Sequence, residues 1–286
     1  MAYYELPPVA VGAGSQPAEA DGAELNYQTM PEGMSTFVMP TMPEPEAVAD
    51  LLPARQLLDE VQSALSDHRP GDPPALFDLG RLDEANLALV DQVLGEGEVS
   101  IVIDGQSPVR IQESVLAGLW RVRYLDCEST LLRDTLEVAD IPGLVRQATF
   151  SNATDHIVLP DAPLPEGVLN APSLVAELDE KSLAYRPGVD PHVINLTLLP
   201  QTEQDLAFLD GLLGEGVVTI LSRGYGNCRI TSTGTRYVWW VQYFNSQDVN
   251  ILNTLEVSEV PEVACAAPED IADSAQRLDE ILEIYR

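Results

Sequence analysis

Apolar side chains recur along the chain first with a helical period and then with a strand period, and this succession occurs twice. Residues 94–142 align without a gap onto residues 213–261 at a constant offset of 119, with 17 identities in 49 positions. The segment Leu94-Gly95-Glu96-Gly97, for example, recurs as Leu213-Gly214-Glu215-Gly216. Because chance does not produce so long a match without gaps, the sequence indicates two copies of one supersecondary unit.

Each unit is predicted to open with a helix. Thr202 followed by Asp205 resembles a shortened capping box, and Gly95 and Gly214 stand where a left-handed C-terminal cap is needed. Apolar residues follow at helical spacing in both copies: Leu82, Ala85, Leu89 and Val93 in the first, Leu206, Leu209 and Leu213 in the second.

Four strands are predicted after each helix, because the apolar residues then alternate with polar ones. The third strand carries an alternating apolar set, Trp120, Val122 and Tyr124, which recurs as Trp239, Val241 and Tyr243. The order α-β-β-β-β with short turns predicts an α+β fold with mainly antiparallel sheets, each with its helix on one face. The sequence leaves open whether the two sheets join, and unpaired strand edges would permit a homodimer.

The remaining segments complete a division into four parts. Residues 1–46 hold seven prolines, seven acids and no base, which predicts an extended acidic arm. Residues 47–150 contain a helix around 57–65 and the first repeat, and 151–190 form a proline-rich connection with a short helix near 174–185. Residues 191–286 hold the second repeat and a C-terminal helix from Pro268, with Ile271, Ala275, Leu278, Leu282 and Tyr285 on one side.

The net charge of the chain limits the kinds of partner that it can bind. The 286 residues contain 46 acids against 15 bases, a formal charge of −31, and Lys181 is the single lysine. Nucleic-acid binding needs clustered bases, and anionic membrane surfaces repel such a chain, so neither partner is expected. A basic leader and an apolar stretch of membrane-spanning length are both missing from the sequence, so we expect a soluble cytoplasmic protein.

Motifs of catalysis and metal binding are absent from the sequence. Three cysteines (Cys127, Cys228 and Cys265) and three histidines are scattered without ligand spacing, so no metal site is expected. No phosphate-binding glycine loop or nucleophile motif occurs, so we expect no catalytic residue and no bound cofactor.

Recurrent charged residues are interpreted as structural. Glu137 and Glu256 recur at equivalent positions, as do Arg110 and Arg229. Acid and base catalysis by paired carboxylates is the alternative, but cross-strand ion pairs of Arg110 with Glu137 and of Arg229 with Glu256 explain both recurrences.

Two features distinguish the second unit from the first. Trp240, Gln242 and Phe244 replace Arg121, Arg123 and Leu125, which indicates either a buried domain contact or a recognition patch. The turn around Tyr225, Asn227, Cys228 and Arg229 either is a plain hairpin or presents these side chains to a partner. Together these seven residues form the hypothetical partner-binding set, with a buried Cys228 favoured over a reactive thiolate.

Several runs of the sequence together resemble the HupH/HyaF family of hydrogenase expression and formation proteins. They are Gly224 to Ile230, Val238 to Asn245, Asn253 to Val257, Pro261 to Val263 and Ala267 to Asp270. The first repeat and the stretch from Met39 to Glu46 fit the same family. The resemblance implies a cytoplasmic accessory protein for maturation of uptake [NiFe]-hydrogenase, acting on the small subunit that carries iron–sulfur clusters before its export. It implies no catalytic residue.

We therefore expect a non-enzymatic, chaperone-like protein whose partners are the small-subunit precursor and other maturation proteins. The negative charge suits a partner with a basic surface. The alternative is an iron–sulfur cluster or iron carrier that uses Cys228 and Cys265. An enzyme acting on the precursor is disfavoured, because the sequence offers no nucleophile paired with a base.

Overall fold

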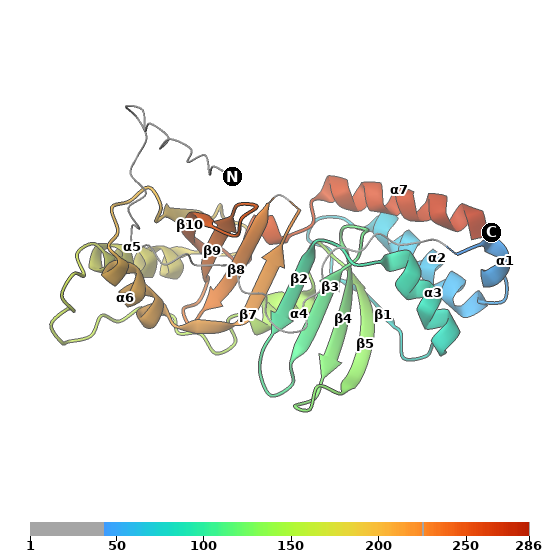
Figure 1. The fold of residues 1–286 in the computed structure, drawn as a ribbon, viewed down its shortest axis with the longest axis horizontal. Coiled ribbons are helices and arrows are strands. Elements are labelled where there is room, and N and C mark those ends of the chain that lie inside the picture. The colour runs from blue at the N-terminus through green and yellow to red at the C-terminus, as the bar shows by residue number, and fades with distance from the viewer. Residues whose placement is uncertain (1–42, 225, 286) are drawn as a thin grey trace, which may run out of the picture.

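One antiparallel sheet of ten strands runs through the computed structural model, which describes residues 43–224 and 226–285 (Figure 1). Its strand order is β1-β5-β4-β3-β2-β7-β8-β9-β10-β6, so the two predicted sheets are continuous. The α+β class and the antiparallel pairing are confirmed. The strands are β1 (Ala75–Asp78), β2 (Val99–Ile103), β3 (Val109–Glu113), β4 (Leu119–Leu125), β5 (Leu131–Val138), β6 (His192–Asn195), β7 (Glu215–Ser222), β8 (Asn227–Thr233), β9 (Val238–Phe244) and β10 (Asn250–Val257).

The helices flank this sheet. They are α1 (Pro45–Val48), α2 (Leu52–Asp67), α3 (Glu84–Leu94), α4 (Gly143–Ala148), α5 (Ala171–Ala184), α6 (Glu203–Leu213) and α7 (Pro268–Tyr285), with a 3-10 turn, η1 (Glu262–Ala264). The capping box of Thr202 and Asp205 is present at the start of α6. The predicted helices near 57–65, 174–185 and 268–285 are α2, α5 and α7. Most of the predicted acidic arm lies outside the described residues, and the limits of the four predicted parts stay a prediction.

The two repeats join through strands that are each other's counterparts. In the antiparallel pair of β2 and β7, Ile101 lies opposite Ile220, which is its own counterpart at the offset of 119. Val99 lies opposite Ser222, and Ile103 lies opposite Val218. This register is self-complementary, so the repeats are related by an approximate two-fold axis at the Ile101 and Ile220 pair.

A short strand begins each repeat and was missed by the sequence pattern. β1 pairs with β5, where Phe77 lies opposite Leu136, and β6 pairs with β10, where Ile194 lies opposite Leu255. Each strand has four residues and lies upstream of the aligned region. The repeat is therefore β-α-β-β-β-β, and its first strand closes the outer edge of its own half.

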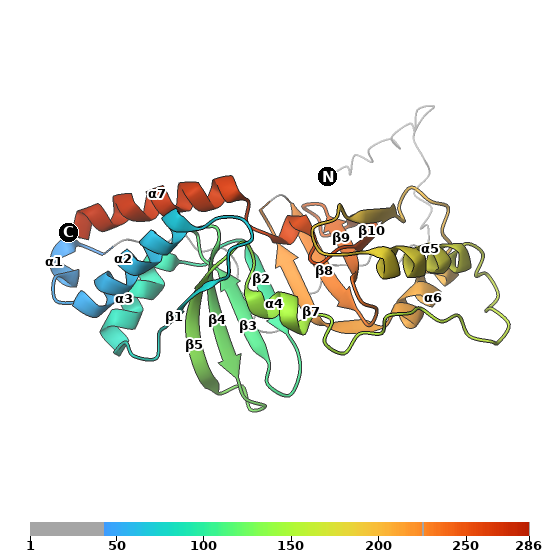
Figure 2. The same cartoon turned by 180° about the vertical axis from the view of Figure 1, so that it is seen from behind.

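Buried side chains lie on both faces of the sheet, in addition to the predicted helices on one face. Strand register places Leu136 and Leu255 on one face, the helix face, and Trp120 and Trp239 on the other, the tryptophan face. On the helix face, α2, α3 and α7 cover the first half and α5 and α6 the second. Figure 2 shows the same halves from behind, with α4 against the sheet near their junction.

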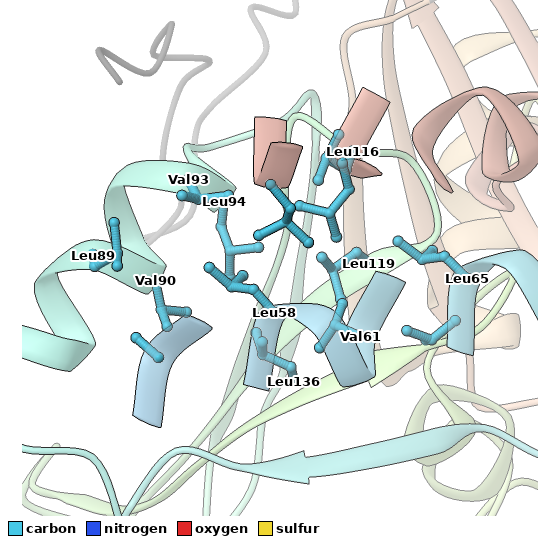
Figure 3. Close-up of a cluster of buried hydrophobic side chains, with 14 of the residues drawn as sticks. Leu58, Val61, Leu65, Leu89, Val90, Val93, Leu94, Leu116, Leu119 and Leu136 are labelled. Carbon is cyan, nitrogen blue, oxygen red and sulfur yellow. The ribbon is translucent and has the colours of Figure 1, made fainter. Parts of the chain in front are cut away.

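The first half has its core between α2, α3, α7 and the sheet. Figure 3 shows Leu58 and Val61 of α2 directed toward Leu119 and Leu136 of the sheet, with Val90 of α3 beside them. On the tryptophan face, a second core contains Trp120 and Trp239 together with Ile101 and Ile220, so it spans both repeats. The fold is therefore one unit whose two halves share a core.

We expect the β2–β7 pair to control stability. Ile101 is 1% exposed and Ile220 is fully buried, so Ile101→Ala or Ile220→Ala should lower the free energy of unfolding by on the order of 2–5 kcal/mol. The double variant should cost less than the sum, because both changes remove the same contact. Chemical denaturation measures all three. Leu76→Ala on edge strand β1, where Leu76 is 58% exposed, is the control and should stay within about 0.5 kcal/mol of wild type; strictly additive costs at the two isoleucines would contradict the prediction.

Candidate functional site

A hollow of about 350 Å³ lies on the helix face of the second half. Its lining includes Arg229 of β8, Trp240 and Gln242 of β9, Asn253 of β10 and Asp210 of α6. Strand register places Arg229 opposite Gln242 and Gln242 opposite Asn253, so three adjacent strands build its floor. The Trp240 indole donates a hydrogen bond to Asn253 Oδ1 and remains partly exposed. An aromatic ring, an amide and a guanidinium thus share one open site, which we call the outer hollow.

In the first half, an ion bridge between charged side chains fills the position that is equivalent to the outer hollow. Arg121 donates from Nε to Asp134 Oδ1 at 3.0 Å and pairs through its Nη2 with Asp134 Oδ2 at 2.7 Å. Its Nη1 pairs with Asp91 of α3. The guanidinium therefore bridges helix and sheet, and its side chain is only 12% exposed.

At the offset of 119, Asp91, Arg121 and Asp134 correspond to Asp210, Trp240 and Asn253. The second copy has thus replaced a helix-to-sheet ion bridge by a neutral bond between indole and amide. Asp210 keeps its place and lines the outer hollow. The outer hollow therefore lies where the first half has its ion bridge.

Of the six described residues of the predicted partner-binding set, three meet in this hollow, namely Arg229, Trp240 and Gln242. Phe244 is 6% exposed, which agrees with the alternative of a buried contact at this position and not with a recognition patch. Asn227 donates from Nδ2 to Asp248 Oδ1 at 3.3 Å, away from the hollow's lining. Tyr225 lies outside the described residues.

Both predicted ion pairs are wrong. Register places Arg110 and Arg229 on the helix face and Glu137 and Glu256 on the tryptophan face, so neither pair can form. Arg110 instead lies 3.6 Å from Asp104, and Glu137 Oε1 accepts a 2.6 Å hydrogen bond from the backbone N–H of Gly143. Burial raises the pKa of both glutamates.

Cys228 and Cys265 sit in surroundings that oppose thiolate chemistry. Cys228 is 1% exposed in the core of the tryptophan face, as the favoured interpretation predicted, and burial raises its pKa to about 12. Burial, with nearby Asp140, likewise raises the pKa of Cys265 to about 12. Metal and cluster ligands need the deprotonated sulfur. Within residues 43–224 and 226–285, no three His, Cys, Asp or Glu side chains are grouped to hold a metal ion.

Sequence reasoning missed Asp210 and Asn253 as parts of the site. Asp210 was not recognised as a site residue because it and its counterpart Asp91 lie three residues before the aligned blocks. Extending the alignment that far would have paired the two aspartates, and Asn253 would have stood out as the neutral counterpart of Asp134. The signal was therefore present in the sequence, but which charges touch each other needed the structure.

The conserved C-terminal region of HupH hydrogenase expression proteins matches residues 51–156 and 168–285 of this chain. The chain belongs to this HupH family. The matched segments cover both repeats and α7, so the conserved region of the family includes the whole two-fold sheet. The predicted resemblance is confirmed.

Relatives in the HupH family match over nearly their whole length. The hydrogenase expression/formation protein HoxQ of Cupriavidus necator is 48% identical, over 99% of this chain and 98% of its own. HupH of Rhodobacter capsulatus is also 48% identical over the same shares. The hydrogenase-1 operon protein HyaF of Escherichia coli is 37% identical, over 96% of this chain and 94% of its own.

A solved HupH structure from Thiobacillus denitrificans is 29% identical and covers 39% of this chain and 92% of its own, with a TM-score of 0.36. Within the part of this HupH-family chain that the structure describes, every helix is too short or too polar to cross a lipid bilayer.

One buried carboxyl at the end of β3 makes stability depend on pH. Glu113, at the end of β3, is 8% exposed, and its Oε1 accepts from the backbone N–H of Gly118 at 3.3 Å. Burial raises its pKa to about 7, and the charges of Glu98 and Asp270 add to the rise. The folded chain therefore favours the protonated acid.

Since the pKa of Glu113 is raised from 4.5 to about 7 on folding, its contribution to stability is lost as pH rises between these values. Glu113→Gln cannot ionise and can still accept from Gly118. Its free energy of unfolding relative to wild type should rise by about 2–3 kcal/mol between pH 5 and pH 8. Denaturation at the two pH values measures the change. Glu283→Gln, an exposed position near the end of α7, is the control; an equal change in both variants would contradict the prediction.

Proposed function

We propose that this chain is an accessory protein in the maturation of uptake [NiFe]-hydrogenase, and that it binds the immature small subunit in the cytoplasm before export. Its relatives carry the names of hydrogenase expression and formation proteins. The proposed action is chaperone-like and non-enzymatic, with other maturation proteins as further partners. The observation that carries the binding role is the outer hollow.

The outer hollow has the composition of a protein-binding site. Trp and Arg are the side chains that most often dominate binding energy at interfaces, and here Trp240 and Arg229 line one concave surface. Gln242 and Asn253 add amide groups that can fix a partner's orientation. Trp240 packs partly against the core of the second half, but the first half folds with an ion bridge in the same place, so the shared frame does not demand a tryptophan there.

Charge supports a partner with a basic surface. The chain has a formal charge of −31, and two carboxylates, Asp210 and Glu215, are among the residues that line the outer hollow. Such a surface steers a basic partner toward the site and repels acidic proteins. The carrier alternative lacks this kind of support, because Cys228 is enclosed in the core.

The test replaces residues of the outer hollow by the residues that form the ion bridge in the first half. In the variant Trp240→Arg, Asn253→Asp, Asp210 remains to complete the ion bridge that Asp91, Arg121 and Asp134 make. The variant should therefore fold and retain the co-expressed small-subunit precursor at least about tenfold less than wild type. Affinity-tagged protein with quantification of the co-purified precursor measures this.

Leu132→Ala is the matched control, since Leu132 is 64% exposed on the distant β5 and is not part of the hollow. A wild-type protein that retains no precursor would refute the proposed client. Equal retention by wild type and the double variant would refute the outer hollow as the binding site and leave the client in place.

A further inference from the structure

A second and larger cavity lies where the two halves meet, at the end of the sheet at which β5 and β10 finish. Its volume is about 1030 Å³. Its wall comes from the end of α2, the first turn of α7, the connection between β10 and α7, and the segment from Tyr185 to Val193. Both halves of the fold contribute to it, and we call it the junction cavity. In Figure 1 the start of α7 stands above this junction.

Apolar groups form much of the wall. Leu65 and Ile271 come from α2 and α7, and Val189, Pro191 and Val193 come from the opposite side. Val189 is 57% exposed and Val193 48% exposed, so the apolar surface continues to the outside of the molecule. A wall of this kind favours an apolar occupant.

Carboxylates outnumber bases in the same wall. Arg146 is occupied, because its Nη2 lies 2.5 Å from Asp140 Oδ2 and its Nη1 lies 3.5 Å from Glu259 Oε2. Arg69 caps the end of α2 by donating to the carbonyls of Ser66 and His68. The cavity-lining carboxylates Glu256, Glu262 and Glu269 are outside the ion pairs found among the described residues. The cavity therefore has a surplus of negative charge.

A buried hydroxyl in the wall has no partner. Ser258 is 4% exposed and lines the cavity, and its Oγ lacks a hydrogen-bond partner in the described chain. The Trp239 indole N–H is likewise unpartnered. In the first half, the equivalent Trp120 donates to the Ala139 carbonyl at 3.0 Å, and Ala139 is the counterpart of Ser258. Buried polar atoms normally have partners, so this wall is complete only with another molecule's polar group beside it.

We propose that the junction cavity binds an extended peptide segment of a protein partner, apolar in character and carrying Lys or Arg. This deepens the proposed function, on which the choice of partner rests, by naming a second contact and its chemistry. Apolar side chains of the segment pack on Val189, Pro191 and Val193. Its basic side chain pairs with Glu262 and Glu269, and a backbone group of the segment bonds to Ser258 Oγ.

The chain's own N-terminal segment does not suit this cavity. Residues 1–42 contain five acids and no Lys, Arg or His, so the carboxylates of the wall would repel them. A cationic segment from another protein is the complementary occupant. Binding by such a segment should weaken as salt rises, since Glu262 and Glu269 are exposed to solvent.

The experiment uses the full chain and designed apolar peptides of roughly ten residues, which span about 33 Å when extended. The peptides carry no Arg, a single Arg, a pair of Arg or a pair of Glu, and fluorescence anisotropy gives each dissociation constant. We expect affinity to increase with Arg and the Glu peptide to stay unbound. Glu262→Gln, Glu269→Gln should weaken the best peptide by about five- to tenfold. Ser258→Ala, which copies the first half, should weaken it by about fivefold while leaving the thermal midpoint unchanged.

Glu280→Gln, Glu283→Gln is the matched control, because it removes the same charge from the distant end of α7 and should leave affinity within about twofold. Equal losses in this control and in the cavity variants would overturn the proposal, as would binding that ignores Arg. Loss only in Trp240→Arg, Asn253→Asp would also overturn it, by placing the peptide in the outer hollow. These outcomes do not depend on the precursor: a protein that binds Arg peptides in the cavity but retains no small subunit refutes the proposed client alone.

Discussion

The pairing of β2 with β7 is the constraint on which the rest of the molecule depends. Because Ile101 meets its own counterpart Ile220 in an antiparallel register, the duplicated chain builds the equivalent of a symmetric dimer within one polypeptide. A dimer of separate chains would lose translational and rotational freedom on association; here the covalent connection removes most of that cost. The shared core on the tryptophan face then packs Trp120 and Trp239 into one cluster with both isoleucines, so neither half has a complete core alone.

Elements outside the repeat make this symmetric frame asymmetric. Helix α7 follows the second repeat but packs mainly on α2 of the first half, and this crossing ties the last helix to the first half. Arg146 makes a second tie, since it pairs with both Asp140 and Glu259, which are counterparts across the axis. The counterpart of Arg146 itself is Cys265, so only one such arginine exists. The junction cavity lies beside this unequal pair.

The sequence predicted the repeated helices and strands because apolar periodicity and glycine caps are local signals. Strands β1 and β6 escaped because four residues carry too little alternation, and their burial depends on β5 and β10 far along the chain. The predicted ion pairs are wrong for a different reason. Recurrence shows that Glu137 and Arg110 are both constrained, but it does not say which face each occupies, and here both faces are buried. Trp240 and Gln242, which the sequence singles out, both line the outer hollow, and their binding role stays a prediction. Phe244 lies on the same face but is buried, because a period of two cannot distinguish a covered from an open position.

The difference between the two copies locates function more sharply than their likeness does. Positions that the shared frame needs, such as Ile101 and Ile220 or Trp120 and Trp239, are identical in both copies. At Arg121 and Trp240 the same frame accepts an ion bridge in one copy and an indole in the other, so folding alone does not determine the residue. Leaving a tryptophan partly exposed forgoes burial worth about 25 cal/mol per Å² of apolar surface, and the ion bridge shows that the site has a closed solution. The partner that we propose would recover this burial by covering Trp240, and this is the physical reason for proposing the second half as the binding half.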